Sequence, residues 1–493
     1  MTINQVILLI IDDLRYDHLN SLMDNGELPH IKKMRENSIY GKSITTFPSV
    51  TMPAHLTIMT GLYQDSYQVP LIHWYDRVNK KIKNYSNNLQ AFEIYKDIGE
   101  VKTIFEMIDG YSCNVFESIH RGATYNYPGK LKAIIKYVYY RYLTNLNKSN
   151  EIVNKRILKV FKKPNKYLPQ KSQEIPKLTV GWFLAPDILL HMFGANSEAY
   201  LNGLKSVDKA IGDLINGLKE LKILDETIII ITSDHGNYTA NELYNPQPHL
   251  SNKNLYPLQP KKQKGDYDVA DGSVLGFYFS GDEDNQYKTE SALRNYNNID
   301  VIKAVQKLKG IKWVAYRSDN NTPNKGTFQI IRKINDKWEN SFIHYSNNKT
   351  RYEIENVDIL NYYNKNSSPD WLDHNKFYSM DEWLKNTHDL DFPMFPDQLF
   401  RNFQNPNCCD LFASSMAEIV YNSVHGVVKK NFHIHAHDVA LRCSMQVPLM
   451  IYNPLFKEKK IIFSKTSDII PTILKILNIK KPTYLCGKNL LNQ

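Results

Sequence analysis

The chain opens with the run Val6-Ile7-Leu8-Leu9-Ile10-Ile11-Asp12-Asp13, in which an apolar stretch stops abruptly at two aspartates. An uninterrupted apolar run of this length is typical of a strand buried on both faces, as in a parallel sheet covered by helices. Three further runs of this kind lie at 178–184, 227–231 and 446–452, and helical patterns separate them, notably at 197–221 and 467–477. The sequence therefore predicts an α/β fold whose mostly parallel sheet is sandwiched by helices.

The bulk composition narrows the class of protein. The chain has 493 residues, of which 42% are hydrophobic, so it can form one large domain with insertions or several ordinary ones. No apolar run in the sequence reaches the length of a membrane span. The run at 6–11 is too short for the apolar region of a signal peptide, has no basic flank and ends in aspartates. We therefore expect a cytoplasmic protein.

Cysteine usage and net charge add two constraints. The five cysteines are an odd number and form no CxxC pair, which argues against a disulfide framework and against a thiolate zinc site. The net charge of +10 and the pI near 9.0 suit an anionic substrate or surface. The alternative explanation is a general bias of the composition toward Lys, Asn, Ile and Tyr.

Side chains that can bind metal follow three of the predicted strands. Asp12 follows the first, Asp187 the second and the pair Asp234-His235 the third, with Gly236 placed to let the backbone turn sharply. Ligands of open α/β sheets bind at the carboxyl ends of strands. A buried carboxylate is costly unless it is paired or bound to a metal. The alternative role is helix capping, which we assign to Asp13 and which leaves Asp12 free for metal.

Further imidazoles extend this candidate metal site. His191 lies four residues after Asp187, so both reach one ion from one side if the segment is helical. Three alternating histidines would share one face of an extended segment: His433, His435 and His437. Two of them could bind metal while the third contacts phosphate, or a single one could matter. His425, followed by Gly426, is a competing candidate, and a structural role is the alternative for any one histidine.

Thr51 opens a segment, 51–61, that is typical of a helix start. Threonine is a poor nucleophile in water, but metal coordination lowers the pKa of its hydroxyl and a helix N-terminus favours a phosphate. The alternative role is a helix N-cap, which is compatible with a nucleophile. Mixed Asp and His ligands suit zinc best, with manganese as the alternative. Two such ions beside an activated hydroxyl would equip the chain to split phosphate esters.

Composition divides the chain into a core and two insertions. Residues 80–175 are polar and Lys-rich, and 130–171 contain twelve Lys or Arg with Glu151 as the single acid. Residues 246–410 are rich in Asn, Asp, Tyr and turn residues, with hairpin-like pieces such as 326–334. We therefore predict a metal-binding α/β core, a basic insertion or cap and a second cap, with the boundaries 1–80, 176–245 and 411–493 for the core, 80–175 for the first cap and 246–410 for the second.

These motifs together resemble the alkaline phosphatase superfamily, and within it the nucleotide pyrophosphatase/phosphodiesterase branch. Residues 9–17 look like the branch's opening strand and first metal aspartate, and residues 51–61 look like its nucleophile segment, T-F-P-N-H-x-T-I-V-T-G. The motifs at 186–191 and 233–236 match its next two metal motifs in order. The closing segments of the superfamily are similar to residues 447–454, 468–472 and 487–491.

The resemblance implies a role for each candidate residue. It assigns one metal to Asp187, His191 and a late histidine, and the other metal to Asp12, Asp234 and His235, with Thr51 bridging to it. The family's late histidine lies in a His-Gly pair shortly before the closing strand. Its spacing to Val447 identifies His437, although Asp438 follows where Gly is usual. The dipeptide His425-Gly426 lies at a different distance from that strand.

Two departures concern the nucleophile segment. Ala54 stands where the branch has an Asn that steadies a phosphoryl oxygen, and His55 or a lysine from a cap is the candidate replacement. Sulfatases share the fold, but their nucleophile comes from Cys or Ser in C-x-P-S-R. The matching residues here, 51–55, contain neither a Cys or Ser to oxidise nor the following Arg, which disfavours sulfatase activity.

The expected function is a two-metal phosphoric ester hydrolase of the phosphodiesterase/nucleotide pyrophosphatase type. Thr51 would attack phosphorus of a phosphate-ester or nucleotide-like substrate, and water would cleave the phospho-enzyme. Phosphotransferase or mutase chemistry and phosphomonoesterase activity are alternatives within the same superfamily. A different class of alternative is a degenerate anion-binding protein, whose basic segment 130–171 binds nucleic acid or an anionic membrane.

Overall fold

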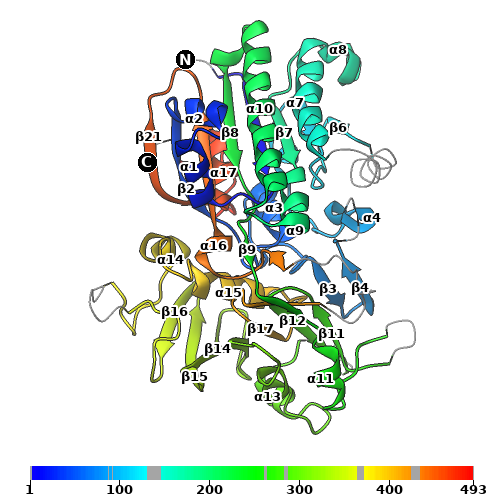
Figure 1. The fold of residues 1–493 in the computed structure, drawn as a ribbon, viewed down its shortest axis with the longest axis vertical. Coiled ribbons are helices and arrows are strands. Elements are labelled where there is room, and N and C mark those ends of the chain that lie inside the picture. Colours follow the sequence, from blue (N-terminus) through cyan, green and yellow to red (C-terminus); the bar gives the residue numbers. More distant parts are fainter. Residues whose placement is uncertain are drawn as a thin grey trace.

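The computed structural model describes residues 3–86, 88–91, 93–129, 146–259, 264–281, 287–363, 371–422 and 434–491. Three predicted features lie outside these residues: the first part of the basic segment at 130–145, the pair His425-Gly426, and His433. The described chain forms an α/β layer structure above a second, antiparallel sheet in the view of Figure 1.

The upper part is built on an eight-stranded sheet of order β21-β2-β20-β8-β1-β7-β5-β6. Its strands are β1 (Gln5–Ile11), β2 (Ser38–Ile44), β5 (Ser112–Val115), β6 (Tyr125–Tyr127), β7 (Leu178–Phe183), β8 (Thr227–Thr232), β20 (Gln446–Tyr452) and β21 (Lys459–Lys465). All of them run in one direction except β20, which is antiparallel to β8 and β2. The mostly parallel α/β sheet is confirmed, but the last of the four predicted strands is reversed, because an apolar run carries no information on strand direction.

The central strand β1 is buried on both faces, as its sequence predicts. Alternate side chains of a strand point to opposite faces. Val6, Leu8 and Ile10 join one hydrophobic cluster, and Ile7, Leu9 and Ile11 join another. Helices α3 (Thr51–Thr60) and α17 (Ile469–Ile476) supply the first cluster, while the second is supplied by α1 (Tyr16–Asp24), α2 (Pro29–Arg35), α7 (Asn147–Lys162), α9 (Ala185–Phe193) and α10 (Glu198–Glu220). None of the helices in the described ranges is long and apolar enough to cross a membrane.

Residues 80–175, which we predicted as an insertion, contribute to the central sheet. They supply β5, β6 and α7, and α7 packs between β7 and α10. Val153, Ile157 and Val160 form the buried face of α7 at helical spacing, while its many lysines face outward. Because those lysines dominate the composition, the amphipathic pattern of the helix is not apparent from the sequence. The smaller elements nearby are β3 (His73–Asp76), β4 (Lys81–Asn84), α4 (Asn88–Ala91), α5 (Ile104–Met107) and α8 (Pro164–Tyr167).

The lower part is a seven-stranded antiparallel sheet of order β11-β12-β17-β13-β14-β15-β16. Its strands are β11 (Tyr267–Ala270), β12 (Val274–Phe279), β13 (Trp313–Arg317), β14 (Lys325–Ile334), β15 (Lys337–Ser346), β16 (Lys349–Ile354) and β17 (Leu411–Ser414). Its helices are α11 (Gln247–Ser251), α12 (Glu290–Arg294), α13 (Val301–Gln306), α14 (Met380–Thr387) and α15 (Phe395–Gln404). Most of this sheet comes from the second predicted cap, 246–410, and β17 extends it past residue 410.

The two sheets share a hydrophobic core near the site described below. The ring of Phe47 lies 5.3 Å from that of Phe395 and 5.6 Å from that of Phe412, measured between centroids. Phe47 belongs to the loop between β2 and α3, whereas Phe395 and Phe412 belong to α15 and β17. The second sheet therefore anchors the loop that leads to Thr51.

Ile230 provides a test of the doubly buried sheet. It lies at the centre of β8 and is 1% exposed, so Ile230→Ala removes methylene groups from a close-packed layer. We expect a loss of about 2–5 kcal/mol in the free energy of unfolding. The matched control is Ile462→Ala on β21, whose side chain is 64% exposed and whose effect should stay within about 0.5 kcal/mol. Urea unfolding of both variants measures the difference, and equal effects would contradict the packing described here.

Candidate active site

Three neighbouring strands of the central sheet end at the same level. Strands β7, β1 and β8 lie side by side, with Ile11 opposite Phe183 and Ile10 opposite Thr232. Because these strands are parallel, the chain leaves all three at one edge of the sheet. The candidate ligands that follow them, and that the structure brings together there, are Asp12, Asp187 and the pair Asp234-His235.

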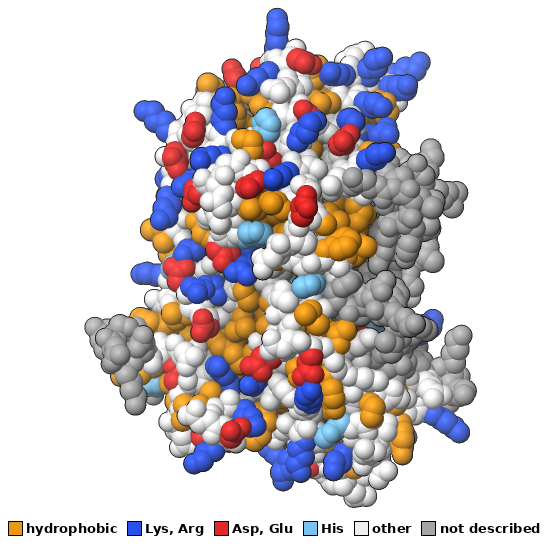
Figure 2. Space-filling model, viewed as in Figure 1, with side chains coloured by type: hydrophobic (Ala, Val, Ile, Leu, Met, Phe, Trp, Pro, Cys, Tyr) orange, Lys and Arg blue, Asp and Glu red, His pale blue; other side chains and the backbone are white. Residues whose placement is uncertain are grey.

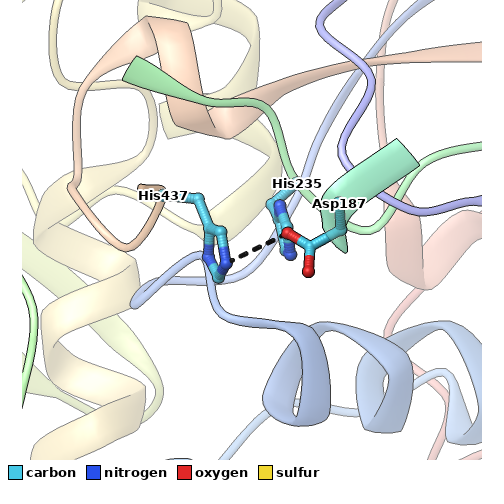
Figure 3. Close-up of side chains that lie close together, drawn as sticks. All are labelled: Asp187, His235 and His437. Atoms are coloured by element: carbon cyan, nitrogen blue, oxygen red, sulfur yellow. Dashed lines mark ion pairs between the residues drawn. The ribbon is translucent and has the colours of Figure 1, made fainter. Parts of the chain in front are cut away.

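The first group of candidate ligands consists of Asp187, His191 and His437. Asp187 Oδ1 lies 3.3 Å from His191 Nε2 and 3.5 Å from His437 Nε2, and the two Nε2 atoms are 3.2 Å apart. Asp187 and His191 are one turn apart on α9, in the helical arrangement that their spacing suggested. Figure 3 shows the His437 ring turned toward the Asp187 carboxylate, with His235 beside them.

The second group consists of Asp12, Asp234, His235 and Thr51. His235 Nε2 is the central atom: it lies 3.5 Å from Asp12 Oδ1, 3.1 Å from Asp234 Oδ2 and 3.1 Å from Thr51 Oγ1. All of these side chains are buried except Thr51, which is partly exposed. The candidate nucleophile therefore lies on the accessible side of the group.

The two groups adjoin each other through stacked imidazoles. The rings of His235 and His437 lie 3.6 Å apart between centroids with an interplanar angle of 14°. The far nitrogens of the first group's histidines contact backbone carbonyls: His191 Nδ1 is 2.7 Å from His435 O, and His437 Nδ1 is 3.0 Å from Ser49 O. A proton on each Nδ1 would donate to these carbonyls and leave each Nε2 lone pair free for a metal.

The donor atoms fit divalent cations. Asp12 Oδ1, Asp187 Oδ1 and Asp234 Oδ2 are buried and accept no hydrogen bond from the residues described. Buried carboxylate oxygens without partners are costly, and a cation between them would remove that cost. Three Asp or His ligands with a further position left open form the donor set of catalytic zinc sites. Asp12, Asp234 and His235 meet this requirement, with donor atoms within 4.8 Å of one another, and Asp187 and His437 form a second such set with His235. Asp187, His191 and His437 meet it as well, with donor atoms 3.2, 3.3 and 3.5 Å apart.

The pKa values of the first group follow from its mutual contacts. Burial would raise the pKa of Asp187, but His191 and His437 lower it to about 2. Burial likewise opposes the charge on His191, yet Asp187 raises the pKa of that imidazole to about 9. For His437, burial and then the neighbouring His235 lower the pKa to about 3, so this ring stays neutral at neutral pH. A neutral imidazole is the form that binds a metal.

The close approach of the carboxylates determines the pKa values of the second group. Burial, followed by the charges of Asp234 and Asp187, raises the pKa of Asp12 well above its usual value. Burial acts in the same direction on Asp234, but His235 and His55 outweigh it and hold the pKa of that carboxyl well below its usual value. The two acidic side chains thus compete for the same positive charge. An added cation would stabilise both in the ionised form.

Thr51 is the first residue of α3 and not its N-cap. The N-cap position is Val50, and its side chain makes no capping hydrogen bond. The alternative role that we considered for Thr51, an N-cap, is therefore wrong by one residue. The hydroxyl instead faces His235, at the end of the helix where N–H groups and the helix dipole attract anions.

Hydrogen bonds that the sequence did not predict hold the aspartates in place. Trp182 Nε1 donates to Asp12 Oδ2 at 3.0 Å, from the penultimate position of β7. The backbone N–H of Asp13 donates to Asp234 Oδ1 at 3.3 Å. The sequence does place Trp182 near the end of the strand that precedes Asp187. A Trp within an apolar run, however, is normally interpreted as a buried core residue.

His55 contacts the carboxylates of Glu117 and Asp234 and is no substitute for a phosphate-binding Asn. Its Nδ1 is 2.6 Å from Glu117 Oε2 and its Nε2 is 3.4 Å from Asp234 Oδ2, with all three side chains fully buried. Burial disfavours the charged ring, but Glu117 and Asp234 raise the pKa of His55 to about 10. Both ring nitrogens are thus engaged by carboxylates, and the replacement for the Asn at Ala54 is not His55.

Asp13 does not cap the following helix, contrary to our prediction. The N-cap of α1 is Arg15, without a side-chain hydrogen bond, and Asp13 is fully buried in a left-handed conformation with φ of 61°. Its Oδ1 lies 4.0 Å from His235 Nδ1, on the side of that ring away from Thr51. Burial is the main cause that raises the pKa of Asp13 to about 7. The sharp turn after β1 directs this carboxylate inward.

Two other details of the predicted site differ in the structure. Gly236 does not have a positive φ; its role is close approach, since a Cβ there would lie 2.2 Å from Cys443 O. His435 is turned away from the first group, and its Nδ1 lies 2.9 Å from Thr239 Oγ1. His435 and His437 thus do not share one face at the site, because β19 (His435–Ala436) is only two residues long.

Comparison with known proteins agrees with this arrangement. The Type I phosphodiesterase / nucleotide pyrophosphatase family matches residues 6–357. A bis(5'-adenosyl)-triphosphatase, ENPP4 of Pongo abelii, is 27% identical over 234 residues, which are 47% of this chain and 47% of the relative. An uncharacterized pyrophosphatase/phosphodiesterase of Schizosaccharomyces pombe is 27% identical over 338 residues, 68% of this chain and 62% of the relative. The chain thus spans less than two thirds of these curated relatives.

Solved structures show the same fold. Human ectonucleotide pyrophosphatase/phosphodiesterase 5 aligns with a TM-score of 0.60 and 16% identity, over 98% of this chain and 97% of that one. An inactive threonine-to-alanine variant of the murine protein, in complex with AMP, aligns with a TM-score of 0.58 and 15% identity, over 97% of this chain and 96% of that one. The match to the family extends over more than half of the sequence, and the chain belongs to the Type I phosphodiesterase / nucleotide pyrophosphatase family.

Proposed function

We propose that the chain is a two-metal phosphoric ester hydrolase of the phosphodiesterase/nucleotide pyrophosphatase type, with Thr51 as its nucleophile. The observation that carries the proposal is the position of Thr51 Oγ1, 3.1 Å from His235 Nε2 at the first residue of α3. Family membership supports the reaction class. The names of ENPP4 and of the AMP-bound murine structure favour a nucleotide-like substrate.

Each ligand group would hold one divalent cation. Asp187, His191 and His437 would bind the first. Asp12, Asp234 and His235 would bind the second, with the Thr51 hydroxyl as an additional ligand. When bound, such ions lower the pKa of the threonine hydroxyl and neutralise charge on the phosphoryl group. Zinc suits this donor set best and manganese is the alternative.

The chain's own residues would then perform a double displacement. Thr51 Oγ1 would form a bond to phosphorus while the bond from phosphorus to the leaving alcohol or nucleotide oxygen breaks, and the proton of the threonine hydroxyl would end on that leaving oxygen. The free N–H groups in the first turn of α3 would bind phosphoryl oxygens. Water would next attack phosphorus, which breaks the bond to Thr51, releases the phosphate product and restores the hydroxyl.

A panel of chromogenic esters tests this function. The full chain, loaded with zinc, should hydrolyse bis(p-nitrophenyl) phosphate and the p-nitrophenyl ester of thymidine monophosphate faster than p-nitrophenyl phosphate. Product analysis with and without added glycerol distinguishes hydrolysis from transfer to an alcohol. Nucleotide binding without turnover of any ester would overturn the proposal in favour of an anion-binding protein.

Two expectations from the sequence remain proposals. One is a cytoplasmic location, which cell fractionation would test. The other is contact between the segment 130–171 and nucleic acid or an anionic membrane. Exposed lysines of α7 and α8 support this contact, and Lys and Arg side chains gather over the upper end of the face shown in Figure 2. Binding that is steeply salt-dependent would be its signature.

A further inference from the structure

We propose that Asp438 is a positioning residue for His437: its carboxylate fixes the segment that carries this imidazole, and thereby the geometry of the first metal group. The inference rests on the proposed function in one respect, since it assumes that His437 binds a metal. It concerns a position where the family resemblance leads one to expect glycine. The structure gives that departure a physical role.

Both oxygens of the Asp438 carboxylate accept hydrogen bonds from residues outside the ligand groups. Its Oδ1 accepts a hydrogen bond from Tyr238 Oη at 2.7 Å, and its Oδ2 accepts one from the Val274 backbone N–H at 2.9 Å. The side chain is buried, with 4% of the residue exposed. Asp438 therefore acts on the site through the backbone of its neighbour His437 and not by direct coordination.

These two donors come from different parts of the fold. Tyr238 lies in β9 (Tyr238–Thr239), on the loop that also carries His235, and its backbone is paired with Ala436 of β19. Val274 begins β12 of the antiparallel sheet. One carboxylate thus joins the loop of His437 both to the loop of His235 and to the second sheet. Ser49 Oγ adds a bond from the nucleophile loop to Val439 O at 3.0 Å.

The backbone conformation of Asp438 indicates that the side-chain carboxylate is the reason for an aspartate at this position. Its φ is 129°, a conformation that favours glycine, so an aspartate is strained there unless its contacts compensate. The opposing residue is Gly272, and a Cβ at that position would lie 1.9 Å from Asp438 Oδ2. A glycine on the facing strand end therefore leaves room for the carboxylate. A backbone role alone would be served better by glycine at position 438.

Zinc binding to the full chain tests the inference. Competition with a chromophoric chelator measures the affinities of the two zinc ions in the parent and in Asp438→Asn. We expect one of the two affinities to fall by about 10–100-fold, as is usual when a partner that orients a ligand is lost. The other affinity should stay at the parental value, and kcat should recover at saturating zinc.

Three further variants separate the explanations. Asp438→Gly relieves the backbone but removes the anchor, and we expect the same loss as for Asp438→Asn. Tyr238→Phe removes a single donor and should give a smaller loss of the same affinity. The control is Asp208→Asn, which removes a buried carboxylate that accepts from the Ile31 N–H at 2.8 Å, at the start of α2. Its zinc affinities should equal those of the parent.

The outcomes are distinct. Parental zinc affinities in Asp438→Asn or Asp438→Gly would overturn the positioning role while leaving the proposed function intact. An equal loss of both zinc ions in Asp438→Asn and in Asp208→Asn would mean a general loss of folding, and would also overturn it. A parent chain that binds no zinc would instead remove the proposed function on which the inference rests.

Discussion

Replacing Thr51 with Ala should abolish turnover while leaving metal binding intact. The substitution removes the hydroxyl together with the γ-methyl group, and in the proposed reaction the hydroxyl oxygen forms the covalent bond to phosphorus. We expect kcat/KM for bis(p-nitrophenyl) phosphate to fall by on the order of 10⁴-fold or more, as for loss of the nucleophile in other covalent catalysts. Zinc content should change little, because the carboxylates and imidazoles around His235 remain.

Two variants control for this result. Thr51→Ser keeps a hydroxyl and should retain measurable turnover. Thr60→Ala removes a buried hydroxyl at the other end of α3, where it donates to Leu56 O at 2.6 Å, and should leave the activity near that of the parent. Full activity of Thr51→Ala would refute the nucleophile role. Trapping of labelled phosphate on the parent, and not on Thr51→Ala, is an independent measurement of the phospho-enzyme.

The candidate aspartate ligands could be predicted because each follows a recognisable strand. In parallel sheets the polar residue after a buried strand lies at the common carboxyl edge. Asp12, Asp187 and Asp234 obey this rule, and neighbouring strands of the sheet carry them. His437 does not follow a strand of that sheet. Its assignment came from the family resemblance, and the structure places its Nε2 3.5 Å from Asp187 Oδ1.

The side chains that hold the aspartates in place could not be predicted, because their contacts join residues that are distant in sequence. The bond from Trp182 to Asp12 and the pair formed by His55 and Glu117 arise only when separate strands and loops are packed together. Nothing in the local pattern around Glu117 marks it as a partner of an imidazole. The same holds for Asp438, whose two donors lie in β9 and β12.

The sequence predicted the elements whose apolar pattern is strong. It did not predict the elements in which charged residues outnumber the apolar ones. The strands at 6–11, 178–184 and 227–231 are uninterrupted apolar runs, and the structure extends or trims them by a residue. Helix α7 and strands β5 and β6 were assigned to an insertion, because lysines dominate the composition of that region. The buried positions Val153 and Ile157 on α7 are correctly spaced, but the surrounding lysines outnumber them.

Removal of metal should have the second largest effect. Dialysis of the full chain against a chelator should reduce hydrolysis of the diester to background, and added Zn²⁺ should restore it more fully than Mn²⁺. The physical reason is the set of buried carboxylate oxygens on Asp12, Asp187 and Asp234 that have no hydrogen-bond partner among the described residues. Hydrolysis that persists in the chelator-treated chain would contradict the two-metal proposal.

Because these carboxylates should bind metal, we also expect metal to raise the melting temperature Tm, which can be measured independently of activity. A ligand that binds only the folded chain stabilises it by about 2.7 kcal/mol at a free concentration of 100 times its Kd. Zn²⁺ should therefore raise the Tm of the metal-free parent by several degrees. Asp234→Asn removes one of the two carboxylates of the second ligand group, so the increase should shrink, and activity should fall with it. The control Asp213→Asn changes a half-exposed carboxylate on α10 and should keep the full increase. If Zn²⁺ raises the Tm of Asp234→Asn as much as that of the parent, this aspartate does not bind the ion, and the second ligand group must be assigned differently.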